Sequence, residues 1–172
     1  EKLQDAFDPT NLTGIKLTAG SNHQWTSWGT DYVSKPQSWV TYGFSSRYGG
    51  YYADGTRLRL AGEVAYRFQP YGSIALATEY NDTKFPTEKG LKNASFWLVS
   101  PRLDITFTNK IYLTTFLQYN EQAKNINLNT RFQWRYAPAS DLYIVYTDNY
   151  LPENFQVKSR AVVLKMTYWW NI

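Results

Sequence analysis

The chain has no cysteine and only one histidine among its 172 residues. The missing cysteines exclude a disulfide framework and a thiolate metal site. The lone His23 leaves only carboxylates to complete a zinc site. No apolar run approaches the roughly 20 residues of a membrane-spanning helix, and the mean hydropathy is −0.51. These absences exclude disulfide scaffolds and helical membrane proteins, and no cofactor or metal is expected.

Aromatic residues are abundant, at 18% with 15 Tyr and 7 Trp. Such a content suits the interfacial belts of a membrane protein or a carbohydrate-binding surface, and it is high for an ordinary core. The net charge of +4 is modest. The basic residues are spread along the chain rather than gathered in a patch, so nucleic acid is not an expected partner.

Apolar residues recur at every second position, and helical periodicity is absent. The last residues illustrate the pattern, because Leu164, Met166 and Tyr168 alternate with Lys165 and Thr167. Segments of this kind are about ten residues long, which is the span of a tilted transmembrane strand. We predict strands at 25–33, 38–48, 56–68, 72–81, 95–107, 111–119, 126–136, 142–149 and 160–171, and Pro101 suggests a bulge or bend.

The links between these segments differ in length at the two ends. Short turns are expected at 35–36, 69–72, 108–110 and 137–140, and longer links at 49–55, 81–93, 121–125 and 148–159. Bacterial outer-membrane barrels have this asymmetry, with tight turns on the periplasmic side. The C-terminus is then expected on the periplasmic side.

Aromatic residues cluster near both ends of the strands, as in the two girdles of a barrel. We assign these membrane-interface aromatics to a periplasmic set and an outer set: Tyr66, Phe68, Phe107, Trp134, Tyr136, Tyr168 and Trp170; then Tyr48, Tyr80, Trp97, Tyr119 and Tyr146. The Tyr51–Tyr52 pair is expected to join the outer belt.

The predicted fold is all-β, an antiparallel up-and-down transmembrane β-barrel with about eight strands, or the C-terminal part of a larger barrel. Residues 38–172 supply eight strands, and residues 1–37 are a lead-in segment with an extra strand. A ninth strand conflicts with the even strand numbers of single-chain bacterial barrels. Either the 25–33 strand packs outside the barrel, or the chain is part of a longer one.

Several stretches resemble one family. They are FWLVSPRLDITFTNKIYLTTFLQYNEQ at 96–122, NLNTRFQWRYAPASDLYIVYTDNY at 127–150, SRAVVLKMTYWWNI at 159–172 and the opening EKLQDAFDPTNLTGIKL. Together they are similar to the C-terminal β-barrel region of Bacteroidota outer-membrane proteins that carry an N-terminal domain like family 9 carbohydrate-binding modules. This resemblance implies an outer-membrane location and a link to glycan handling. It implies no catalytic residue.

Charged residues occupy the opposite face of the predicted strands from the apolar ones, and they would face the barrel lumen. The expected lumen charge network consists of Arg57, Arg59, Glu63, Arg67, Glu79, Arg102, Asp104, Arg131, Arg135 and Lys165. Small barrels fill their interiors with side chains, and buried charges must be paired, so an ion-pair network is expected. The basic excess leaves an anion-preferring pore or binding site as the alternative.

Catalytic chemistry is not expected. His23 lies in a polar stretch, so a solvated loop histidine is favoured over a hydrolase base. The carboxylates Asp82, Glu88, Asp148 and Glu153 are placed in links that lack calcium-loop spacing.

The function predicted from the sequence is a non-enzymatic outer-membrane protein for surface binding, uptake or assembly in an envelope complex. Its expected partners are the lipid bilayer with its lipopolysaccharide and proteins of that complex, and a glycan ligand is left open. The alternatives are a soluble β-sandwich that binds glycans, with its aromatics on one sheet face, and an outer-membrane enzyme.

Overall fold

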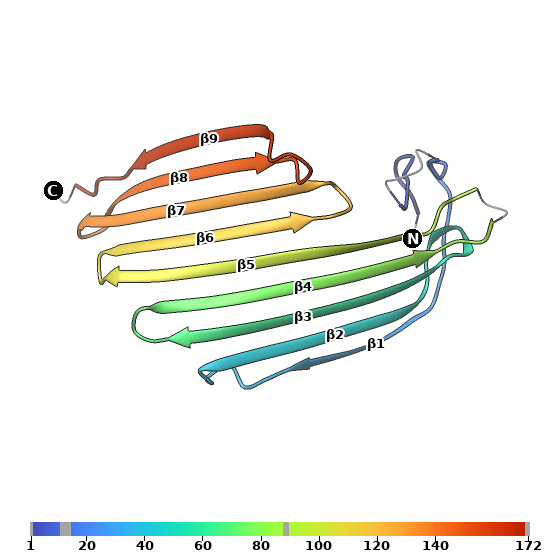
Figure 1. Cartoon of the computed structure of the whole chain (residues 1–172), viewed down its shortest axis with the longest axis horizontal. Coiled ribbons are helices and arrows are strands. Elements are labelled where there is room, and N and C mark those ends of the chain that lie inside the picture. Colours follow the sequence, from blue (N-terminus) through green and yellow to red (C-terminus); the bar gives the residue numbers. More distant parts are fainter. Residues whose placement is uncertain (1, 11–14, 88–89, 171–172) are drawn as a thin grey trace.

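The computed structural model describes residues 2–10, 15–87 and 90–170. They form one antiparallel sheet in which every strand pairs with its neighbours in sequence (Figure 1). The strands are β1 Ser27–Val33, β2 Val40–Gly50, β3 Thr56–Phe68, β4 Gly72–Lys84, β5 Ala94–Thr108, β6 Ile111–Asn120, β7 Asn125–Ala137, β8 Ser140–Tyr150 and β9 Val157–Met166. A 3-10 turn, η1, covers Tyr52–Asp54. The predicted all-β, up-and-down order is confirmed.

No helix in the described part of the chain is long and apolar enough to cross a membrane.

The first predicted strand belongs to the sheet. β1 pairs with β2 along its whole length, from Ser27 opposite Gly49 to Val33 opposite Gly43. The alternative in which this segment packs outside is therefore wrong. β2 has β1 on one edge and β3 on the other, so a minimal eight-stranded barrel closed by β2 and β9 is not formed.

The last strand ends earlier than predicted, at Met166 rather than near residue 171. Thr167 still exchanges two backbone hydrogen bonds with Asp141, at 2.8 and 3.2 Å. The Trp169 N–H then donates to the Ser140 hydroxyl at 3.0 Å. β8 begins at Ser140, so no further partner backbone is available. The predicted end at Asn171 lies outside the described residues.

Pro101 causes no register shift. It lies opposite Leu76 of β4, and the pairing of β5 with β6 keeps the same register on both sides of it. A proline removes a single N–H, so only the local ladder towards β6 is interrupted. The bulges lie near strand ends instead, between Thr106 and Thr108, Arg135 and Ala137, and Asn149 and Tyr150.

The two ends of the sheet differ in the length of their links, with one exception. At one end, called the turn end, the strands are joined by 34–39, 69–71, 109–110 and 138–139. At the other end, called the loop end, the links are 51–55, 85–93, 121–124 and 151–156. The exception is the 34–39 link, which was expected to be a two-residue turn and is longer than the 51–55 and 121–124 links of the loop end. The other turn-end links have three residues or fewer.

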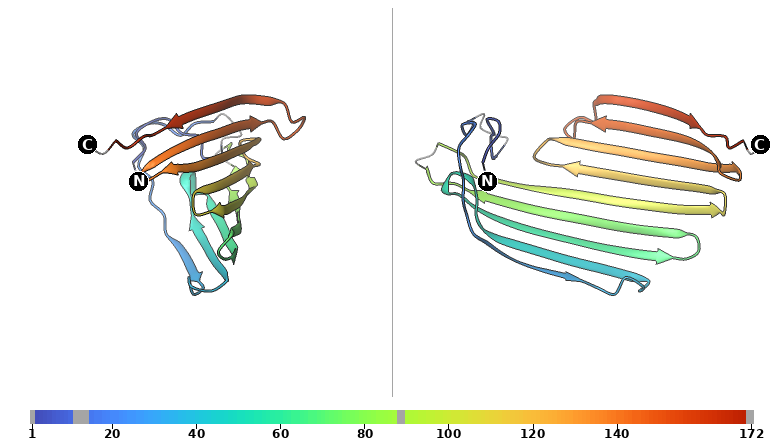
Figure 2. Two further views of the ribbon diagram at one scale, coloured as in Figure 1. Left: turned by 90° about the vertical axis from the view of Figure 1, so that its left-hand side faces the viewer. Right: turned by 180° about the vertical axis from the view of Figure 1, so that it is seen from behind.

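The sheet is curved and has a single layer (Figure 2). Among the described residues no strand pairs with the outer edge of β1 or β9, so the sheet is not closed. Closing a barrel would require these edges to be paired, because unpaired edge N–H and C=O groups are exposed pairing sites.

The most buried apolar side chains lie at the loop end. They are Leu3, Tyr52, Phe85, Leu91 and Ala94, each at most 8% exposed. This cluster brings together the loop-end links and a segment that we call the N-terminal cap, residues 2–10 and 15–24. Isolated bridges join Lys2 to Asn22 and Phe7 to Leu17 within the cap.

Tyr52 links the cap to the sheet. Its ring lies 5.4 Å from Phe7, 5.3 Å from His23, 4.8 Å from Trp25 and 4.9 Å from Tyr51, measured between centroids. The expectation that the Tyr51–Tyr52 pair joins an interfacial belt is therefore wrong for Tyr52, which is 8% exposed. The reason is that the cap folds back over η1 and covers the ring.

Replacement of Tyr52 with Ala is expected to release the cap. Loss of a buried aromatic ring costs about 3 kcal/mol locally, so limited proteolysis should cut within residues 2–24 much faster than in the wild type. Tyr71→Ala, at a 65% exposed turn-end ring, is the control and should leave the digestion unchanged. Equal digestion of the wild type and Tyr52→Ala would contradict this role.

Candidate functional site

The sheet has one polar and one apolar face, and the register keeps them distinct across all nine strands. Directly paired residues of an antiparallel sheet point to the same face, and successive residues alternate. We define the polar face by Arg57, Arg59 and Glu63 of β3, and the apolar face by Leu58, Leu60 and Val64. All ten predicted network residues lie on the polar face: Arg57, Arg59, Glu63, Arg67, Glu79, Arg102, Asp104, Arg131, Arg135 and Lys165. That this face lines a lumen stays a prediction.

The best-connected charges lie between β3 and β4. Arg59 makes a bidentate ion pair with Glu79, in which Nε donates to Oε1 at 2.8 Å and Nη2 donates to Oε2 at 2.6 Å. Asn81, which is fully buried, donates to Glu79 Oε1 at 2.8 Å and accepts from Arg57 Nε at 3.0 Å. Sequence reasoning missed Asn81, although its alternation with Glu79 could have placed it on this face.

Two further clusters lie nearer the turn end. Arg102 binds Asp104 at 2.9 Å, and Thr114 also donates to this carboxylate at 2.9 Å. Arg135 Nε lies 3.2 Å from Asp141 Oδ1, which Gln133 also approaches at 3.0 Å. Asp141 was missed because the eighth strand was predicted to begin one residue later.

The remaining predicted charges are not joined to these clusters. Arg67 donates to the Pro36 carbonyl at 2.7 Å. Glu63, Arg131 and Lys165 make no ion pair with any described residue. The polar face therefore carries separate local clusters with cations left over, rather than the single satisfied network that was expected.

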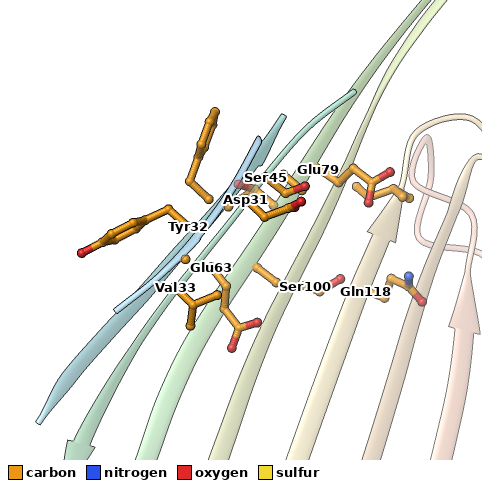
Figure 3. Close-up of a pocket in the computed structure, with 15 residues that line it drawn as sticks. Asp31, Tyr32, Val33, Ser45, Glu63, Glu79, Ser100 and Gln118 are labelled. Atoms are coloured by element: carbon orange, nitrogen blue, oxygen red, sulfur yellow. The ribbon is translucent and has the colours of Figure 1, made fainter. Parts of the chain in front are cut away.

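A hollow of about 370 Å³ crosses the polar face from β1 to β6. Its floor contains small residues, among them Gly43, Ala61 and Ala77. Figure 3 shows Asp31, Ser45, Glu63, Glu79, Ser100 and Gln118 on the hollow side, while Tyr32 points to the other face. These small residues leave space between the longer side chains of Glu63 and Glu79, which also line the hollow. The face therefore offers hydroxyl, amide and carboxylate groups to water or to a ligand.

The apolar face is exposed from β1 to β9. Trp28 of β1 is 80% exposed and Leu164 of β9 is 69% exposed. Other large residues on this face are also exposed: Tyr32, Val40, Tyr42, Phe44, Tyr48, Val64, Tyr66, Ile74, Leu76, Trp97, Trp134, Ile144, Val162 and Met166. Contiguous exposed apolar surface of this extent marks a surface that contacts lipid or protein.

Most of the predicted interface aromatics lie towards the ends of the strands. Tyr66, Phe68 and Trp134 lie towards the turn end of the apolar face, and Tyr48, Tyr80, Trp97 and Tyr119 towards the loop end. Tyr146 lies near the middle of β8, opposite Thr130. Phe107 and Tyr136 lie at bulges, and Tyr168 and Trp170 follow β9.

The structure adds aromatics that the girdle pattern did not predict. Tyr32, Tyr42 and Phe44 lie between the two ends on β1 and β2, with the Tyr32 and Tyr42 rings 5.9 Å apart. Near the β1 edge, aromatic rings therefore continue across the middle of the apolar face.

Asp148 forms a buried polar cluster on the apolar face, near the loop end. Its carboxylate is fully buried and accepts hydrogen bonds from the hydroxyls of Tyr146 and Tyr150, the latter at 2.6 Å. Arg160 of β9 approaches it through Nε and Nη2, both at 2.7 Å. The sequence predictions overlapped at Asp148, which lay both in the 142–149 strand and in the 148–159 link; the structure places it within β8, which ends at Tyr150. Tyr146, which was predicted to be an interface aromatic, is thus a hydrogen-bond donor to this carboxylate.

In the same loop-end region, Lys124 donates to Glu153 at 2.9 Å, and this contact raises the pKa of Lys124.

His23 lies in the cap beside a serine. The Ser21 hydroxyl oxygen is 2.8 Å from His23 Nε2, but this hydroxyl already donates to the Thr18 carbonyl at 2.7 Å. A hydrolase pair needs the serine proton directed at the histidine, which acts as base. This geometry therefore does not activate a nucleophile.

No protein-family model matches the chain, and no curated protein matches it.

Asp148→Asn is expected to lower the stability of the β8–β9 edge. The amide loses the charge-assisted contact with Arg160 and cannot accept as fully from both tyrosines. The midpoint of denaturant unfolding, followed by tryptophan fluorescence, should fall relative to the wild type. Asp31→Asn, which removes a polar-face carboxylate from the edge strand β1, should change the midpoint little. Equal midpoints for both variants would contradict the role given to Asp148.

Proposed function

We propose that this chain is an outer-membrane β-barrel region without catalytic chemistry, acting in surface binding, uptake or assembly within an envelope complex. The observation that carries the proposal is the apolar face, which no described part of the chain covers from β1 to β9. Burial of apolar surface is the main stabilising term for a fold. A face of this size therefore needs lipid or protein against it.

Strand lengths support lipid as the cover. β2 to β9 have 10 to 15 residues. A tilted transmembrane strand needs about 9–11 residues. Aromatic residues near both strand ends fit the two interfaces of a bilayer, where amphipathic rings are enriched.

Direction of the edge strands constrains how the barrel closes. β1 and β9 both run from the loop end to the turn end, because an even number of up-and-down steps separates them. A barrel that is antiparallel throughout therefore needs an odd number of further strands between them. Within a membrane, closure is required, since unpaired backbone groups in hydrocarbon cost several kcal/mol each.

The polar face supports a role in binding or conduction rather than catalysis. Its clusters are ion pairs and amide contacts such as Arg59–Glu79 and Gln133–Asp141. The Ser21–His23 contact lies in the cap and lacks the proton direction of a hydrolase. The excess of cations on this face favours anionic over cationic solutes.

Orientation follows from the links. Outer-membrane barrels place tight turns in the periplasm, which puts the end of β9 on the periplasmic side and the cap on the outer side. The resemblance to Bacteroidota outer-membrane proteins agrees with this placement. Lipopolysaccharide would then lie against the loop-end half of the apolar face, and glycans or protein partners would meet the loops.

A soluble glycan-binding β-sandwich would instead need a second sheet on the apolar face, and the described residues form one sheet.

A matched pair of substitutions on β9 tests the lipid face. Leu164 points to the apolar face and Val163 to the polar face. Leu164→Arg should destabilise the membrane-inserted protein by about 2–4 kcal/mol, because a cation is placed in hydrocarbon. Val163→Arg should have a small effect. Leu164 is preferred to Leu128, whose direct neighbour Asp148 would pair with an introduced arginine. Equal losses in the free energy of unfolding for Val163→Arg and Leu164→Arg, measured by urea unfolding in lipid vesicles, would contradict the assignment of the apolar face to lipid.

Expression with a signal peptide tests the location and the closure together. We expect the chain in the outer-membrane fraction, extracted only by detergent. A band whose gel mobility changes on boiling would mean that these residues close into a stable barrel. An outer-membrane or aggregated band without such a change would mean that closure needs further strands. Soluble folded protein without detergent would overturn the proposal in favour of the glycan-binding module.

A further inference from the structure

We propose that a cavity between the N-terminal cap and the loop end of the polar face binds an organic anion, a carboxylate or phosphate carried on a body about the size of a sugar ring. This site goes beyond the proposed function and does not depend on membrane insertion. It differs from the central hollow of Figure 3, which lies further along the strands.

Several separate segments build the cavity, whose volume is about 450 Å³. The cap contributes Phe7 and Lys16, the loop-end links contribute Tyr51 and Gln122, and the sheet contributes Arg57 and Phe96. A hydrogen bond from Gln122 Nε2 to the Thr10 carbonyl, at 2.8 Å, joins the cap to the 121–124 link. The volume falls within the range of about 300–1,000 Å³ typical of small-molecule sites.

The charges in the cavity favour an anion. Lys16 makes no ion pair with any described residue, and the one side-chain hydrogen-bond partner of Arg57 there is the neutral Asn81. Asp8, the carboxylate of the lining, accepts from both the backbone and the hydroxyl of Thr10, at 2.9 and 2.8 Å. Lys16 is exposed and Arg57 is half-buried. Cations without a carboxylate partner bind anionic oxygens through charge-assisted hydrogen bonds.

Arg57 is held in position from two sides. Its guanidinium lies over the Tyr51 ring, 5.2 Å from the centroid, and its Nε donates to Asn81 at 3.0 Å. An adjoining cavity of about 190 Å³ contains Arg47 and Arg59 together with Arg57. Arg59 is neutralised by Glu79, but Arg47 makes no ion pair with a described residue. The positive charge therefore continues beyond the first cavity, towards β2.

The aromatic walls indicate that the anion is part of a larger molecule. Phe7 of the cap, which is 40% exposed, and Phe96 of β5 both line the cavity. Such rings contact the apolar faces of a ligand, while polar groups fix its orientation. Gln122 commits its amide N–H to Thr10, and its carbonyl oxygen is an acceptor for a ligand hydroxyl. An inorganic anion would bind Lys16 and Arg57 but would make no contact with the Phe7 and Phe96 rings.

Isothermal titration calorimetry on the full chain in detergent tests the site with four probes: glucuronate, glucose 6-phosphate, glucose and inorganic phosphate. We expect both charged sugars to bind, glucose not to bind, and inorganic phosphate to bind at least about tenfold more weakly than glucose 6-phosphate. The tighter of the two charged sugars identifies carboxylate or phosphate as the preferred group. No binding of either charged sugar, or equal binding of glucose, would overturn the proposal.

Charge-removing variants show whether these residues form the site. Lys16→Gln and Arg57→Gln should each weaken the binding of the charged sugars at least about tenfold, since each substitution removes a charge-assisted contact. Arg131→Gln is the matched control, because Arg131 is a polar-face cation in the middle of β7, outside the cavity and without an ion pair to a described residue. An equal loss of affinity for the charged sugars in Arg131→Gln, or an unchanged affinity in Lys16→Gln and Arg57→Gln, would overturn the assignment. An unchanged circular dichroism spectrum in each variant shows that folding is retained.

Discussion

The backbone ladder that links nine strands in a continuous register is the constraint on which the rest of the structure depends. Because side chains alternate with a period of two, a slip of one residue in any pair would move every later side chain to the wrong face. The three bulges lie near strand ends, where a shift disturbs few residues. The ladder thus keeps one face mainly apolar and the other mainly polar, and the Asp148–Arg160 pair is a polar exception on the apolar face.

The described residues form one sheet, so no second layer of the chain covers its apolar face. The stability of the sheet must therefore come from what covers that face. A soluble sheet of this kind buries one face against helices or another sheet. Here the most buried apolar side chains gather at the loop end, around Tyr52 and Phe85. A bilayer would supply the missing cover, and pairing of β1 and β9 with further strands would remove the open edges.

The polar face is organised by distance from the loop end. Near the loop end the cap and the Arg57–Asn81–Glu79–Arg59 contacts enclose cations beside aromatic rings. The middle is hollow because its floor contains glycine and alanine. Towards the turn end, Arg102 and Arg135 bind Asp104 and Asp141. Solutes that approach from the loop side would meet the cap and its cations first.

The sequence by itself determined the strands, their alternation and the division of charged from apolar residues, because a period of two is a local property of the chain. It did not reveal which charges meet, since Arg59 and Glu79 are 20 residues apart and Asp148 and Arg160 are 12 apart. Burial of Tyr52 under the cap and the open edges at β1 and β9 were also decided by the tertiary structure. Such contacts depend on register and on chain reversal over long distances, which no local pattern encodes.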